Sequence, residues 1–168
     1  LLTDGLLGLG LGVEPVEVNT MKRPPREPQE SLFSGGLLQH VIWVGIVIGL
    51  TALGLGALFH DGSNPTDHHW QTMIFTSLAF LQIGQALASR STRVSIFTLG
   101  LWSNPVMVIL ALITLVLQLT VLYVPFLAQL FEIVPLGFGE LLLCIVTGIG
   151  MLVLIEAEKI WLRHQETA

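Results

Sequence analysis

The chain has 168 residues, of which 52% are hydrophobic and 11% charged, and its formal net charge is −5 at pH 7. With a mean hydropathy of +0.77, this composition excludes an ordinary soluble globular domain and favours a membrane protein. Its single cysteine, Cys144, excludes a disulfide framework and a thiol metal motif, and no basic stripe with interleaved aromatic residues points to nucleic acid as a partner.

Residues 1–13 form an apolar segment that contains one carboxylate, Asp4, directly after Thr3 and followed by a glycine at every second to third position. A charge inside an apolar span is costly and needs a partner or a function. Glycines there let the backbone unwind and present oxygen ligands, which hard cations prefer. The pattern makes Thr3 and Asp4 candidate cation ligands; the alternative is an aspartate that reaches water or caps a helix. Because residue 1 is not Met and already lies in the apolar segment, we expect a longer reading frame.

Residues 14–31 are predicted to form a loop, because four prolines in this polar stretch forbid a continuous helix. Residues 32–59 are apolar and exceed the roughly 20 helical residues that cross a bilayer. We interpret His40 as hydrogen-bonded or interfacial rather than as a ligand. Gly45 and Gly49 form a small-xxx-small face that is typical of close helix contacts, although chance spacing explains such a pair equally well.

Residues 60–69 form a short polar turn with three histidines and two aspartates. Their spacing does not fit a preformed helical metal site, so a solvated loop is favoured over a metal cluster. The second span, residues 70–89, carries no formal charge but has Gln82 and Gln85 on one helix face. Amides inside a membrane must find partners, and hydrogen bonding between helices is the interpretation that the residues themselves favour.

Residues 90–104 are a mixed connector, and residues 105–131 are predicted to be a third full span without charge. Thr114 and Gln118 lie four residues apart on one face of this span, and Tyr123 suits the interfacial belt near its far end.

Residues 132–140, with one proline and two glycines, are predicted to be a turn. Residues 141–155 are predicted to form the apolar part of the last span. Its helix continues into a charged tail, with Trp161 at the water boundary.

The cations are segregated along the chain. All of them lie in the first loop, the third loop or the C-terminal tail: Lys22, Arg23, Arg26, Arg90, Arg93, Lys159 and Arg163. Under the positive-inside rule these segments, including the C-terminus, are cytoplasmic. We therefore predict an all-α, polytopic transmembrane helix bundle with four full spans plus a partial leading span. Its parts are a partial transmembrane helix with an ion-site turn (1–13), a cytoplasmic loop (14–31), and a four-helix membrane bundle with short loops and a cytoplasmic tail (32–168).

Several short motifs carry a resemblance to a known family. They are Thr3-Asp4-Gly5-Leu6, Gly12-Val13-Glu14-Pro15, Met21-Lys22-Arg23-Pro24-Pro25-Arg26, Ser31-Leu32-Phe33, Tyr123-Val124-Pro125-Phe126 and Val134-Pro135-Leu136. Together they resemble the C-terminal transmembrane region of P-type cation-transporting ATPases, most closely the calcium-pump branch, from the sixth transmembrane helix to the C-terminus. One position departs from the family pattern: Leu7 stands where a proline usually follows the Thr-Asp-Gly turn, and Gly8, Gly10 and Gly12 are the residues that would supply flexibility instead.

The resemblance implies which residues bind the ion. In the family the Thr and Asp of the Thr-Asp-Gly turn coordinate the transported cation, which makes Thr3 and Asp4 metal ligands at an unwound turn. Gln82 falls where calcium pumps with two ion sites place a glutamate, so the chain resembles the single-site type, and Gln82 is expected near the site. The implied cargo is a cation, calcium in this branch, and the implied partners are the preceding parts of the same pump and the lipid bilayer.

The sequence also lacks what an autonomous pump requires. It has no Gly-rich phosphate loop and no Asp-Lys-Thr-Gly-Thr phosphorylation motif, so ATP and Mg²⁺ would act only through domains absent from this chain. The competing hypothesis is a freestanding multi-span membrane scaffold or binding protein that pumps nothing. The reading frame upstream of Leu1 distinguishes the two, because a pump requires several hundred preceding residues.

Overall fold

The computed structural model describes residues 2–16, 36–60, 68–91 and 94–166, and all regular structure in these ranges is helical, which confirms the all-α fold class. The elements are α1 (Leu2–Gly12), α2 (Leu37–Leu58), α3 (His69–Ala88), α4 (Ile96–Leu99), the 3-10 helix η2 (Leu101–Ser103), α5 (Pro105–Tyr123), α6 (Pro125–Leu130) and α7 (Phe138–Glu166).

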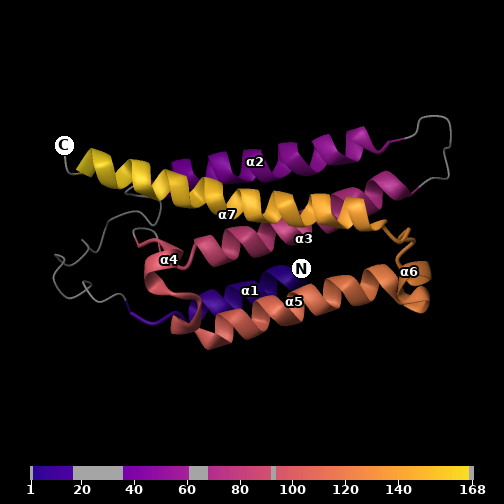
Figure 1. Cartoon of the computed structure of the whole chain (residues 1–168), viewed down its shortest axis with the longest axis horizontal. Helices are drawn as coiled ribbons and strands as arrows, with labels where there is room; N and C mark the ends of the chain where they lie inside the picture. The colour runs from indigo at the N-terminus through magenta and orange to yellow at the C-terminus, as the bar shows by residue number, and fades with distance from the viewer. Residues whose placement is uncertain (1, 17–35, 61–67, 92–93, 167–168) are drawn as a thin grey trace.

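Helix α3 is the centre of the bundle. It contacts α2 and α7 on one side and α1 and α5 on the other, and α1 also packs along α5 (Figure 1). The end of α1, the α4–η2 connector and the C-terminal end of α7 gather at one end of the bundle, whereas α6 and the start of α7 lie at the opposite end (Figure 1). The N-terminal end of α1 lies about midway along the bundle.

Three of the helices in the described residues are long and apolar enough to cross a membrane: α2, α5 and the Phe138–His164 part of α7. Helix α3 has 20 residues but carries several polar side chains. Three of these polar residues, Thr72, Thr76 and Ser77, are buried among neighbouring helices, where lipid does not reach them; Gln82 and Gln85 are half-buried and Gln71 is exposed. The structure thus supports an integral membrane protein with three apolar spans, and does not establish the predicted four full spans plus a partial one.

The predicted third span of residues 105–131 is shorter than expected. Helix α5 begins at Pro105 under an N-cap, because the side chain of Asn104 accepts a hydrogen bond from the backbone N–H of Met107 (3.0 Å). It ends at Tyr123, and Pro125 starts the separate helix α6. Proline lacks the N–H that would continue α5 and disfavours helical backbone before it, which is why the span stops there.

Gly45 and Gly49, whose spacing fits either a close helix contact or chance, make no close contact with another helix in the described part of the chain. A Cβ atom built on either glycine would meet nothing within 4 Å. The close approach occurs instead between α3 and α7: a Cβ on Gly148 would lie 2.5 Å from the carbonyl oxygen of Phe80, and one on Gly84 would overlap the carbonyl oxygen of Gly148. Small residues therefore do permit backbone contact in this bundle, but at another helix pair.

His40 is hydrogen-bonded, as predicted. Its Nδ1 atom lies 2.6 Å from Oε2 of Glu158 on α7, and the indole N–H of Trp43 donates to Oε1 of the same carboxylate (2.6 Å). At the other end of the bundle, Nε2 of His69 lies 3.1 Å from Oε1 of Glu140. The predicted polar turn of residues 60–69 lies mostly outside the described residues.

Candidate cation site

The segment that carries Thr3 and Asp4 is a continuous helix, so the unwound turn expected there is wrong. Helix α1 runs from Leu2 to Gly12 without a break, and Asp4 lies in its first turn. Leu7 keeps the backbone N–H that a proline would lack, and an α-helix satisfies its own backbone polar groups in an apolar environment. Because Asp4 is exposed, its position fits the alternative of an aspartate that reaches water as well as the ligand hypothesis.

Helix α1 is held by an apolar cluster that it shares with α3 and α5. Leu7 is buried in this cluster. The other members are Leu11 of α1, Ile83, Ala86 and Leu87 of α3, and Met107 and Ala111 of α5. Gly10 approaches α5 so closely that an added Cβ would lie 3.2 Å from the Cα atom of Met107, so a glycine at this position lets the two backbones pack together.

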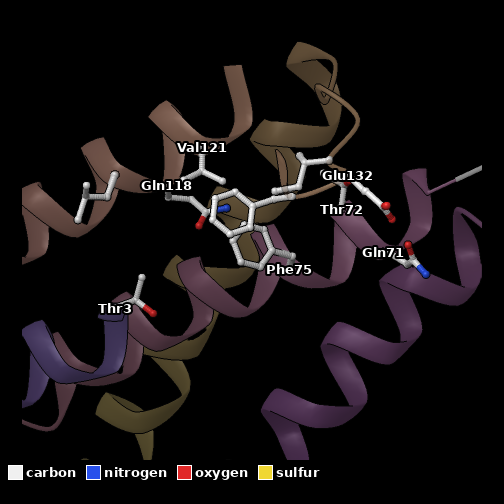
Figure 2. A pocket seen from close by; sticks show the side chains of 10 residues that line it. Thr3, Gln71, Thr72, Phe75, Gln118, Val121 and Glu132 are labelled. Atoms are coloured by element: carbon white, nitrogen blue, oxygen red, sulfur yellow. The ribbon is translucent and has the colours of Figure 1, made fainter. Parts of the chain in front are cut away.

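Thr3 lines a cavity of about 480 Å³. The cavity lies between the first turn of α1, the first half of α3, the last half of α5 and the loop after α6, and its lining residues are Thr3, Gln71, Thr72, Phe75, Leu117, Gln118, Val121, Phe131, Glu132 and Ile133. Figure 2 shows Thr3 at one side and Gln71 and Glu132 at the other, with Gln118 between them. Thr3 is half-buried, and Asp4 beside it is exposed.

Sequence reasoning did not assign Gln118 and Glu132 to any site. Gln118 is buried, and its amide Nε2 lies 3.4 Å from the hydroxyl of Thr76 on α3. Glu132 is exposed and has a backbone φ of +54°, a left-handed conformation that is uncommon for a residue other than glycine. The one sequence signal for a site here was the polar amide of Gln118 in an apolar span without charged residues.

Gln82 is half-buried on α3 next to Ile83, in the part of α3 that packs on α1, and it is not among the residues that line the cavity. The structure thus places Thr3 and Asp4 on one helical turn and Gln82 on the neighbouring helix.

The three predicted ligands offer few oxygen atoms. Thr3 can supply one, the Asp4 carboxylate two and Gln82 one, whereas Ca²⁺ takes six to eight oxygen ligands. Within the described residues, no three side chains of His, Cys, Asp or Glu gather in a metal-binding group. A calcium site at Thr3 and Asp4 therefore requires further oxygen ligands beyond these three residues.

The end of α1 opposite Thr3 is fixed by a polar group that we call the α1 anchor: Glu14, Arg90 and Asn104. The guanidinium group of Arg90 donates to both carboxylate oxygens of Glu14, with Nη2 to Oε1 at 2.8 Å and Nε to Oε2 at 3.0 Å. The side-chain amide of Asn104 donates to Glu14 Oε2 (2.7 Å) and to the carbonyl oxygen of Gly10 (3.1 Å). Burial acts to raise the pKa of Glu14, but the hydrogen bonds from Arg90 and Asn104 and the charge of Arg90 outweigh it and hold that pKa below its ordinary value.

Comparisons with known proteins give a family match over most of the chain. A family model described as "Cation transporting ATPase, C-terminus" matches residues 1–161. The chain is similar to "Calcium-transporting ATPase 1" of Yarrowia lipolytica (32% identity, 99% of this chain) and of Bacillus cereus (36%, 79%), and to human "Calcium-transporting ATPase type 2C member 1" (32%, 95%). It spans only 17–18% of the length of each of these relatives.

Proposed function

The chain belongs to the family of cation-transporting ATPase C-terminal regions, and from this premise we propose that it works as the C-terminal membrane portion of an ATP-driven pump that transports calcium. The observation that carries the proposal is the match over residues 1–161. Calcium is favoured because relatives that match most of the chain bear the name calcium-transporting ATPase.

Thr3 and Asp4 are the proposed ligands of the transported ion, with Gln82 the weaker candidate. The N-terminal end of α1, which carries them, lies about midway along the bundle (Figure 1), the depth at which a transported ion must be desolvated. A carboxylate there is costly unless a cation offsets its charge. The missing oxygen ligands would come from the preceding helices of the same pump, which are therefore the proposed partners, together with the lipid bilayer.

The proposed topology has four full spans, with α3 crossing the membrane inside the protein, and α1 as a partial leading span. Helix α3 supports this because it contacts α1, α2, α5 and α7 and buries half of its 20 residues, among them Thr72, Thr76 and Ser77. The end of the bundle that holds Arg90 and Lys159 would be cytoplasmic, as would the C-terminus, because cations accumulate on that side. The loop of residues 14–31 would then lie next to the cytoplasmic domains, through which ATP and Mg²⁺ would act.

The test is transport by the full-length protein that contains this chain. Expressed in membrane vesicles, it should accumulate ⁴⁵Ca²⁺ when ATP is added and hydrolyse ATP faster when calcium is present. Vesicles with an unrelated membrane protein are the control. If the full-length protein neither accumulates calcium nor shows any cation-dependent ATP hydrolysis, the alternative of a membrane scaffold is favoured instead.

A further inference from the structure

The α1 anchor joins three segments through one buried cation. The Arg90 side chain has no solvent exposure, and that of its partner Glu14 has 15%. Besides both oxygens of Glu14, Arg90 Nη1 reaches the carbonyl oxygens of Gly100 (3.2 Å) and Leu101 (3.4 Å). Arg90 follows α3, Glu14 follows α1, and the two carbonyl groups belong to the α4–η2 connector, so the guanidinium group ties together segments up to 76 residues apart.

Asn104 extends the anchor to α5. Its side-chain amide donates to Glu14 and to the last turn of α1 at Gly10, while its side-chain oxygen caps the start of α5 at Met107. Asn104 is itself buried. Since an unpaired buried charge or amide is costly, sliding α1 along its axis would break several charge-assisted hydrogen bonds at once. The anchor therefore opposes axial movement of α1 far more than an apolar contact would.

Helix α1 transmits this constraint to Thr3 and Asp4. Asn104 holds α1 at the carbonyl oxygen of Gly10, six positions after Asp4. A helix rises about 1.5 Å per residue, so Asp4 lies roughly 9 Å from this contact along the same short helix. Glu14 follows two residues after that helix ends. The glycines of α1 do not interrupt the helix. The anchor at the C-terminal end of α1 thus fixes how deep Thr3 and Asp4, at the N-terminal end, lie relative to α3 and α5.

We propose that Arg90, acting through Glu14, is a positioning residue for the cation site: it holds α1 at one depth in the bundle and so sets the position of Thr3 and Asp4. The claim that Arg90 fixes the depth of α1 rests on the hydrogen bonds of the anchor. The claim that this depth affects cation transport rests on the proposed function. The two parts can be measured separately.

The structural part is tested by hydrogen–deuterium exchange in the purified full-length protein. Arg90→Gln should speed exchange of the α1 amides by roughly tenfold, the factor expected when one charge-assisted hydrogen bond is lost, and leave α7 unchanged. In a Glu14→Gln background, Arg90→Gln should add little, because the partners form one coupled unit. The matched control is His40→Asn, which removes a hydrogen bond between two other helices, α2 and α7, and should leave α1 unchanged. Unchanged exchange of α1 in Arg90→Gln overturns the positioning role, whether or not the protein pumps.

The functional part is tested by calcium titration of ATP hydrolysis. Arg90→Gln should raise the calcium concentration for half-maximal activity by roughly tenfold and change the maximal rate less than twofold, and Arg90→Lys should recover part of the affinity because it keeps the charge but not the two-pronged geometry. A variant that loses maximal rate at unchanged calcium affinity would show a general structural role and overturn the proposal. Absence of calcium-dependent hydrolysis in the wild type would overturn the proposed function instead, and the exchange experiment would still decide on the anchor.

Discussion

Gly84 on α3 and Gly148 on α7 lie in direct backbone contact, with no room for a Cβ atom on either residue. Gly148→Ala should therefore destabilise the protein by about 1–3 kcal/mol, the usual cost of overpacking, because the nearest atoms belong to the backbone of Phe80 and cannot rotate away. Gly150→Ala is the matched control on the same helix, since nothing lies within 4 Å of its added Cβ, and it should be neutral or stabilising through helix propensity. Thermal unfolding in detergent measures both. Equal melting temperatures for the two variants would contradict the close contact.

The sequence could not distinguish this pair from Gly45 and Gly49. Both the predicted and the observed contacts use small residues on apolar helices, and the three- to four-residue spacing that singled out Gly45 and Gly49 concerns one helix only. The partner of Gly84 lies 64 positions away on α7, and only the packing of α3 between α2 and α7 decides which glycines meet.

A buried ion pair on α7, next to the end of α3, provides a second prediction. Lys159 Nζ lies 2.7 Å from Glu156 Oε1 and also donates to the carbonyl oxygen of Ala88 (2.6 Å). Lys159→Met should cost about 3–5 kcal/mol, because it leaves the Glu156 carboxylate buried without its cation. The double variant Glu156→Gln/Lys159→Met should lose less, since it removes that uncompensated charge. Urea-induced unfolding measures the stability of both variants. If the double variant is less stable than Lys159→Met, the cost of Lys159→Met does not come from an uncompensated Glu156 charge.

The ion pair between Glu14 and Arg90 has a defined pH dependence. Because the pKa of Glu14 in the folded protein lies below its ordinary value of 4.5, its stabilising contribution is fully present above pH 4.5 and is lost as the pH falls through the folded-state pKa. Glu14→Gln should therefore lower stability by about 1.5 kcal/mol equally at pH 6 and pH 8. The difference from the wild type should shrink only in more acidic solution. A difference that vanishes between pH 8 and pH 6 would mean that another group carries the effect.

The topology predicts opposite sidedness for the two ends of the bundle. Gly137 lies in the turn before α7 and Trp102 in the α4–η2 connector, and both are exposed. Gly137→Cys should react with an impermeant thiol reagent from outside the cytoplasm, and Trp102→Cys only after permeabilisation. The native Cys144 is fully buried and should stay unlabelled, so the wild type is the control. Labelling of both introduced cysteines from the same side would contradict an odd number of crossings between them.

Apolar length predicted α2, α5 and α7 well, because a bilayer span leaves a strong signal in one segment. The proline at 125 ends the third span early, so α5 stops at Tyr123. The predicted span ran on to residue 131 because the residues on both sides of Pro125 are equally apolar. The α1 anchor could not be predicted, since Glu14 and Arg90 are separated by 76 positions and each looks like an ordinary loop charge. Thr3 and Asp4 were predicted as ligands from the residue pattern and from the family resemblance, whereas the cavity beside Thr3 emerges only from the meeting of α1, α3 and α5.

The most direct test of the proposed function is calcium-dependent phosphorylation of the full-length protein by ATP in the variant Asp4→Asn. An amide of the same shape is a much weaker ligand for a hard cation than a carboxylate, so phosphorylation should be lost although the protein folds and inserts into the membrane. Gln82→Ala is the matched comparison and should be milder, because a neutral amide contributes about 1–2 kcal/mol in a membrane. Near-normal calcium affinity in Asp4→Asn would contradict the account, and would show that Asp4 reaches water or stabilises the first turn of α1.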